Sequence, residues 1–199
     1  MALVAPVVER WLRDRTRVLV RPIRPEDREG LAVGLNRLSA ASRYQRFHAA
    51  VAELSAEQLR CLTEADQVNH LAWIALDPAL PGEPVAGVAR CIRLPEEPQT
   101  AEVAVTVLDT YQGRGLGTML PGYLSQAAAA RGIRMFRAYV LEDNDAMLRI
   151  FWDLGATVGY LEEGVYRLDV PVHEDAETIP DTPSGRVFKT VARGQYQTS

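Results

Sequence analysis

The feature that most constrains the fold is a glycine-rich turn, YQGRGLG at residues 111–117, which separates two regular segments. Residues 100–109 alternate as a β-strand does, and residues 116–131 have the composition of an α-helix. Backbone N–H groups at the start of a helix are unpaired and carry the positive end of the helix dipole. Because glycine has no Cβ atom, this turn lets such N–H groups approach an anion closely. The sequence therefore predicts a site for an anion such as a diphosphate. A tight turn that merely uses glycine is the alternative interpretation.

Two common phosphate-binding motifs do not fit this turn. The P-loop ends in Gly-Lys-Ser/Thr, whereas the run Gly117-Thr118-Met119 lacks the lysine. The dinucleotide fingerprint G-x-G-x-x-G opens a βαβ unit, but four expected strands come before this turn. The anion site must therefore belong to another architecture.

The remaining hydrophobic patterns divide the chain into short alternating elements. Ser55 and Gln58 have the spacing of a capping box, and Asn144 is placed as a helix N-cap. The expected strands cover residues 17–22, 70–77, 85–94, 100–109, 134–141, 157–161 and 165–172. The expected helices cover residues 25–38, 39–47, 54–66, 116–131 and 145–154.

Composition limits the class of protein. A chain of 199 residues with 47% hydrophobic residues suits one ordinary globular domain. The net charge of −4 does not favour nucleic acid, and no segment suggests a membrane span, a leader peptide or a metal site. We expect a cytoplasmic protein with a domain over residues 1–172 and a polar tail over residues 173–199, in which RVFKTVA could add a small contact.

At the glycine turn the chain resembles the GNAT family of acetyl-CoA-dependent N-acetyltransferases. QGRGLG fits the family pattern Q/R-x-x-G-x-G/A, and the order of elements matches over residues 17–172. VRPIRPED, LSAASRYQRF, AEVAVTVLDTYQGRGLGT and LEDNDAMLRIF resemble the acetyltransferase domain of bacterial protein lysine acetyltransferases. The resemblance implies an α/β (α+β) domain with a mixed, mostly antiparallel sheet of about six to seven strands and helices on both faces.

The resemblance also implies a site for acetyl-CoA. Asn144 matches an asparagine that touches the pantetheine arm, although its role as a plain N-cap is compatible with this. The end of the strand at Val105 and Val107 would bind the same arm as an added strand does. The pyrophosphate would lie against the backbone of Gln112, Gly113, Arg114, Gly115, Leu116, Gly117 and Thr118.

N-acetylation needs a neutral amine, and a lysine amine has a pKa near 10.4, so a general base helps. Glu102 is the candidate, because it is the one carboxylate in an apolar strand and matches the general-base glutamate of the family. Partial burial would raise its pKa. The alternative interpretation is a solvent-facing carboxylate at a strand edge.

The general acid is harder to place. Many GNAT enzymes have a tyrosine seven residues after the asparagine, where this chain has Phe151. Tyr111, Tyr123, Tyr139 or a water molecule are left as candidates.

The helix over residues 42–47 has two arginines and two aromatic residues. We expect Tyr44, Phe47 and Val51 to face the core, and Arg43 and Arg46 to face solvent.

Three functions are compatible with these patterns. The leading one is an N-acetyltransferase that uses acetyl-CoA and acts on a protein lysine. The second acts on a small amine, such as a polyamine or an antibiotic. The third is an acyl-CoA-binding sensor without turnover. Homodimer formation is left open.

Overall fold

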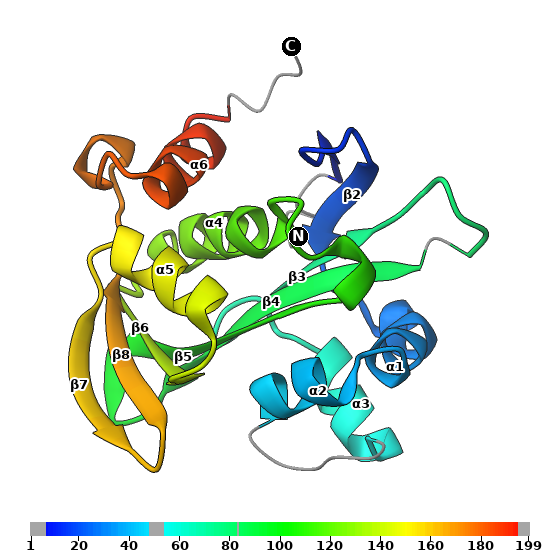
Figure 1. Ribbon diagram of the computed structural model, residues 1–199, viewed down its shortest axis with the longest axis horizontal. Helices are drawn as coiled ribbons and strands as arrows, with labels where there is room; N and C mark the ends of the chain where they lie inside the picture. The colour runs from blue at the N-terminus through cyan, green and yellow to red at the C-terminus, as the bar shows by residue number, and fades with distance from the viewer. Residues whose placement is uncertain (1–6, 48–53, 83, 195–199) are drawn as a thin grey trace.

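The computed structural model describes residues 7–47, 54–82 and 84–194 (Figure 1). Within these residues the strands form one sheet in the order β1-β2-β3-β4-β5-β6-β8-β7. The strands are β1 (Val8–Trp11), β2 (Arg17–Pro22), β3 (His70–Leu76), β4 (Val85–Leu94), β5 (Glu97–Val107), β6 (Met135–Leu141), β7 (Thr157–Glu162) and β8 (Val165–Pro171). All neighbours are antiparallel except β5 and β6, which are parallel.

Helices cover both faces of this sheet, as the sequence predicts (Figure 1). The α-helices are α1 (Arg28–Asn36), α2 (Ala40–Phe47), α3 (Ala56–Thr63), α4 (Leu116–Ala129), α5 (Asp145–Asp153) and α6 (Pro183–Ala192). Short 3-10 turns lie at Pro25–Asp27, Asp109–Tyr111 and Ala176–Thr178. Helix α4 packs on β3, β4 and β5, and α1 and α2 pack on β4 and β5 from the other face. The core is therefore two apolar layers with the sheet between them.

Alternation along β5 decides which side chains face which layer. An added Cβ on Gly117 of α4 would contact Val107 at 3.8 Å, so the odd-numbered side chains of β5 face α4. Thr106 and Leu108 line a cavity together with Leu31 of α1, so the even-numbered side chains face α1 to α3. Glu102 therefore lies on the same face as the N-terminal helices.

The sheet has eight strands in the described residues, one more than the upper number expected. The additional strand is β1, which pairs with β2 through Val8↔Val20 and Trp11↔Arg17. It is only four residues long and alternates between half-buried and exposed residues. The hydrophobic signal of such a short edge strand is too weak to detect in the sequence.

The segment expected to be a polar tail contains a packed helix. Helix α6 lies against α4, and its Phe188 and Val191 are buried. Thr182 caps this helix by accepting a hydrogen bond from the Gly185 N–H at 3.0 Å. The contact of RVFKTVA is thus larger than the sequence suggested, while the division of the chain at residue 172 stays a prediction.

Candidate functional site

The glycine turn presents a row of backbone donors at the start of α4. Gly113 and Gly115 have φ values of +71° and +95°, which side chains other than glycine rarely adopt. Gly115 is the N-cap of α4, and its carbonyl accepts the N–H groups of residues 118 and 119. The N–H groups of residues 113–115 have no acceptor among the described residues, and those of residues 116 and 117 precede the first helical hydrogen bond. These five donors fit a diphosphate.

Gln112 and Arg114 use their side chains to hold the turn in place. Gln112 Nε2 donates to the Val107 carbonyl and to Ser42 Oγ, at 3.1 Å each. The Gln112 N–H donates to the Asp109 carbonyl at 3.2 Å. Among the backbone groups predicted to bind a pyrophosphate, this N–H therefore already has an acceptor. Arg114 forms an ion pair with Asp14 at 2.7 Å.

The tip of the β1–β2 hairpin supports the turn from outside. The Arg13 N–H donates to the Arg114 carbonyl at 3.0 Å, and Arg114 Nη1 donates to Thr16 Oγ1 at 3.2 Å. Carbon and Nε atoms of the Arg13 side chain lie 3.5–3.8 Å from where a Cβ on Gly115 would be. Sequence reasoning missed Arg13, because only the hairpin brings it to the turn.

Strands β5 and β6 pair over three residues and then diverge. Their register runs from Thr100↔Met135 to Glu102↔Arg137 and goes no further. The Leu108 N–H donates to Ala86 on the β4 side, so by alternation the backbone groups of Val103, Val105 and Val107 point toward the β6 side. In the described residues the Val105 backbone groups and the Val107 N–H therefore have no strand partner on this side, whereas the Val107 carbonyl accepts Gln112 Nε2. Pairing of this edge with an extended pantetheine arm stays a prediction.

Asn144 lies directly after β6, on the other side of this divergence. Its Oδ1 accepts a hydrogen bond from the Met147 N–H at 3.2 Å, which confirms its role as the N-cap of α5. A contact with a pantetheine arm stays a prediction.

Glu102 lies at the point where the two strands separate. It is opposite Ile92 of β4 and Arg137 of β6. Its side chain is exposed, so the partial burial expected from the sequence is wrong. Burial lowers the pKa of Arg46 and raises that of Tyr139, and the negative charge of Glu102 has a smaller upward effect on both. These two side chains therefore belong to the surroundings of the candidate base.

The three candidate tyrosines differ in environment. Tyr111 donates to Asp77 at 2.8 Å, and burial followed by this hydrogen bond raises its pKa to about 12. Tyr123 is buried and stacks on Trp73 with a centroid distance of 5.2 Å. Tyr139 is 37% exposed on β6, and burial together with Tyr160 and Glu102 raises its pKa. Of these three tyrosines, only Tyr139 is both exposed to solvent and close enough to Glu102 for that charge to raise its pKa.

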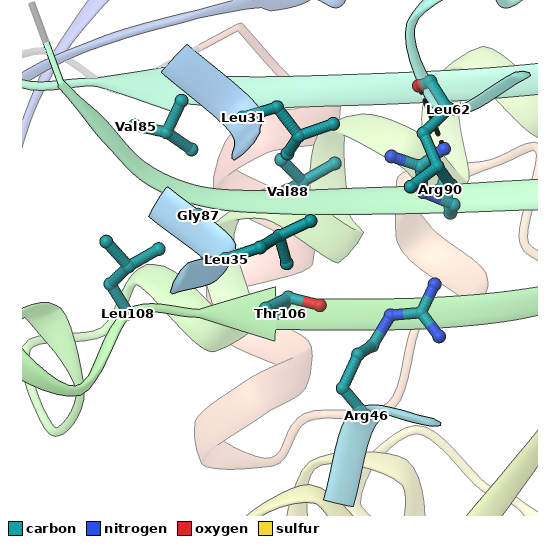
Figure 2. A pocket seen from close by; sticks show the side chains of 10 residues that line it. All are labelled: Leu31, Leu35, Arg46, Leu62, Val85, Gly87, Val88, Arg90, Thr106 and Leu108. Carbon is teal, nitrogen blue, oxygen red and sulfur yellow. Dashed lines mark hydrogen bonds between the residues drawn. The ribbon is translucent and has the colours of Figure 1, made fainter. Parts of the chain in front are cut away.

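Helix α2 has the opposite orientation to the one expected. Tyr44 is 50% exposed, whereas Arg46 lines a cavity beneath the helix (Figure 2). Arg43 Nη2 donates to the Leu35 carbonyl at 3.2 Å. The side chain of Phe47 and all of Val51 lie outside the described residues. An arginine can bury its long stem and still reach a polar group, which the pattern of apolar residues does not reveal.

Two features are absent from the part of the chain that the structure describes. No helix there is long and apolar enough to cross a membrane. In the same residues no three His, Cys, Asp or Glu side chains gather as metal ligands do.

Comparisons with known proteins find similarity over most of this chain. A family model described as an acetyltransferase (GNAT) domain matches residues 17–157. Acetyltransferase Pat of Mycolicibacterium smegmatis is 37% identical over 164 residues, which are 82% of this chain and 48% of the relative. Acetyltransferase PA5475 of Pseudomonas aeruginosa is 36% identical over 144 residues, 72% of this chain and 77% of the relative.

Among solved structures, the GNAT domain of S. lividans PAT superimposes with a TM-score of 0.74 and 34% identity. The match covers 83% of this chain and 96% of that domain. The chain thus spans about half the length of the Pat relative and nearly all of an isolated domain.

Proposed function

Because the chain belongs to the GNAT family of acetyltransferases, we propose that it transfers the acetyl group of acetyl-CoA to the ε-amine of a protein lysine. The family supports the reaction class. The choice of acceptor rests on the resemblance of SRYQRF, AEVAVTVLD and NDAMLRI to protein lysine acetyltransferase domains. If this chain is part of a longer protein, we propose the same activity for that protein.

One arrangement supports this proposal most strongly. In the described residues the backbone edge formed by Val105 and the Val107 N–H has no strand partner, and it leads from the free N–H groups of the glycine turn to Glu102. A pyrophosphate on the turn and a pantetheine arm along the edge would bring the thioester toward the carboxylate. The residues assigned to the donor are Val105, Val107, Asn144 and the turn from Gln112 to Thr118. Within that turn residues 113–117 supply the free donors.

Glu102 acts as the general base in this proposal. Its carboxylate accepts, directly or through water, the proton that the attacking amine loses. The amine nitrogen forms a bond to the acetyl carbon while the C–S bond breaks, and a proton converts the departing thiolate to the thiol of CoA. Tyr139 is the proposed donor of that proton, since Phe151 is buried and has no hydroxyl group.

The exposure of Glu102 favours an acceptor that arrives from solvent. An exposed base can be reached by a lysine on the surface of a folded protein. The neighbouring carboxylates of Glu97 and Asp169 form ion pairs with Arg137, at 2.6 and 2.9 Å.

The test compares acceptor classes under one readout, the release of CoA thiol from acetyl-CoA. Folded proteins with exposed lysines, including acyl-CoA synthetases chosen by family analogy, are measured against polyamines, aminoglycosides and free amino acids. We expect the highest kcat/KM with a protein. A small amine with a far higher value would replace the lysine proposal by the second function. Binding of acetyl-CoA without transfer to any acceptor would favour the sensor.

A further inference from the structure

Two arginines from different elements line one small cavity on the face of the sheet opposite α4 (Figure 2). Arg46 comes from α2 and Arg90 from β4, and Figure 2 shows the Arg46 side chain reaching toward β4 while the Arg90 guanidinium points toward the Leu62 carbonyl. The volume is about 20 Å³. The other lining residues, from α1, α3, β4 and β5, are Leu31, Leu35, Leu62, Val85, Gly87, Val88, Thr106 and Leu108. We call this space the arginine cavity.

Arg90 is a buried cation with only neutral partners in the described residues. Its exposed fraction is 6%. Nη1 donates to the Leu62 carbonyl at 2.9 Å and lies 3.3 Å from His70 Nε2. In the ranges that the structure covers, no carboxylate lies within 4.0 Å of its guanidinium. A guanidinium has five N–H donors, and both of these contacts are made by Nη1.

The charges around Arg90 increase the demand for an anion. Burial, and then the charge of Arg46, lower the pKa of Arg90 to about 9, so it is still a cation at neutral pH. His70 adds no further positive charge, because burial and Arg90 lower its pKa to about 4 and leave it neutral. The negative charge of Glu102, which is also on β5, raises the pKa of Arg46 against the larger effect of burial. A buried cation without a counter-ion is costly, and a carboxylate is its strongest hydrogen-bonding partner.

The position of the arginine cavity relates it to the reaction. Arg90 is opposite Ala104 of β5, which lies between Glu102 and Thr106 on the same face of that strand. Thr106 lines the cavity and its hydroxyl group adds a third donor. A water molecule needs roughly 10–15 Å³ of such space, so a cavity of about 20 Å³ has room for about one water-sized group, such as one oxygen of an entering carboxylate.

We propose that Arg90, together with Arg46, forms a subsite for a carboxylate that enters with a substrate. This inference rests on the proposed function. The carboxylate is either the terminal group of a dicarboxylic acyl chain on CoA or an acidic side chain next to the acceptor lysine. The carboxylate is unchanged by the reaction, in which the C–S bond breaks and the C–N bond forms.

Two ratios of kcat/KM test the subsite, and each covers one source of the carboxylate. The donor ratio compares succinyl-CoA with acetyl-CoA. The acceptor ratio compares a lysine peptide that has a neighbouring glutamate with the same peptide carrying glutamine. Both are measured for the wild type, for Arg90→Gln and for Arg60→Gln. The last variant is the matched control, because Arg60 is an exposed arginine of α3 outside the cavity lining.

We expect at least one ratio to fall about 10- to 100-fold in Arg90→Gln, as the loss of a charge-assisted hydrogen bond predicts, and to stay unchanged in Arg60→Gln. The variant Arg90→Lys keeps the charge without the planar fork and should lose part of the same ratio. If Arg90→Gln does not fold, Arg46→Gln takes its place, since Arg46 is less deeply buried.

The outcomes separate the subsite from the proposed function. Acetyl transfer with both ratios unaffected by the arginine variants overturns the subsite and leaves the transferase in place. If no acceptor is acetylated, the proposed function fails. In that case the dissociation constants of the two acyl-CoA molecules and of the two peptides are measured by calorimetric titration. The donor ratio and the acceptor ratio are then calculated from these constants. Equal constants in the wild type and in Arg90→Gln would reject the subsite there too.

Discussion

Ser42 of α2 donates a hydrogen bond to Asp109, 2.7 Å away across 67 residues of sequence. The Ser39 N–H and hydroxyl groups donate to the same carboxylate at 2.9 Å each. Ser42 Oγ also accepts a hydrogen bond from Gln112 Nε2 at 3.1 Å. The start of α2, which carries Arg46, is thereby fixed to the residues that lead into the glycine turn. The Asp109 carboxylate therefore joins α2 to the segment that begins the glycine turn.

Asp109→Asn should destabilise the fold, and the effect should depend on pH. Burial raises the pKa of Asp109, but hydrogen bonds from Ser42 and Ser39 outweigh it and hold the pKa below its ordinary value. The unfolded chain therefore binds the proton first as the pH falls, so the contribution is complete above the ordinary pKa and disappears as the pH falls through the lowered one. Tm measured from pH 3 to pH 7 should show the largest difference from wild type near pH 7. Asp143→Asn, an exposed control, should follow the wild type, and a constant difference at all pH values would contradict this role.

Gly115→Ala should lose acetyl-CoA binding, whereas Gly132→Ala should keep it. Both glycines have positive φ values, +95° and +77°, so alanine strains either position by about 1–2 kcal/mol. Only Gly115 lies at the proposed pyrophosphate site, where the strain would displace the free N–H groups. We expect both variants to melt a few degrees lower, by roughly 2–4 °C per kcal/mol. Millimolar acetyl-CoA should restore Tm in Gly132→Ala alone. Equal ligand-induced shifts in the two variants would exclude the turn as the binding site.

Glu102→Gln should bind acetyl-CoA normally and lose turnover at neutral pH. Glutamine keeps the shape of the side chain but cannot accept the proton of the amine, so kcat should fall by about 10²–10⁴. Part of the activity should return as the pH approaches the lysine pKa near 10.4, where the amine is neutral without help. Glu96→Gln, in the exposed turn between β4 and β5, is the control and should not change kcat. Wild-type turnover in Glu102→Gln at pH 7 removes this residue from the mechanism.

Tyr139→Phe should lower kcat with little change in KM for acetyl-CoA. Tyr139 is in β6, the strand that pairs with β5 at Glu102. Burial, Tyr160 and Glu102 raise the pKa of its hydroxyl group, so the group stays protonated at neutral pH. Loss of a general acid costs about 10²–10⁴ in rate. Tyr44→Phe is a matched control, because Tyr44 is an exposed tyrosine of α2. A thioester with a more acidic leaving thiol should be less sensitive to Tyr139→Phe; equal sensitivity would point to a structural role.

Local chemistry made much of the fold predictable. The capping box at Ser55 and Gln58 forms as expected, with the Gln58 N–H donating to Ser55 Oγ at 3.1 Å. Gly164 lies in the turn between the strands expected at residues 157–161 and 165–172, and its φ of +76° suits the hairpin that β7 and β8 form. Gly155 follows the end of α5 with a φ of +83°. Each of these features depends on neighbours within a few residues, so the sequence alone contains the information.

The parts that the sequence did not predict depend on contacts between distant segments. Arg13 reaches Gly115 because β1 and β2 form a hairpin, and Arg46 meets Arg90 because α2 packs on β5. The amphipathic pattern of an eight-residue helix does not determine its orientation when half of its polar residues are long arginines. Glu102 was found from the sequence, since one carboxylate in an apolar strand is a local signal, but its exposure is set by where β6 diverges.

His70 should make the free energy of unfolding fall between about pH 6.5 and pH 4. Burial, and then the nearby charge of Arg90, lower the pKa of His70 from its ordinary value of 6.5 to about 4. In this window the unfolded chain binds a proton that the folded protein does not, so stability rises with pH there and levels off above it. His70→Gln removes the titrating group. Chemical denaturation at half-unit steps from pH 4 to pH 8 should show a smaller decline for the variant than for the wild type, with curves that run parallel above pH 7. Parallel curves over the whole range would mean that His70 is not shielded from protonation in the folded protein.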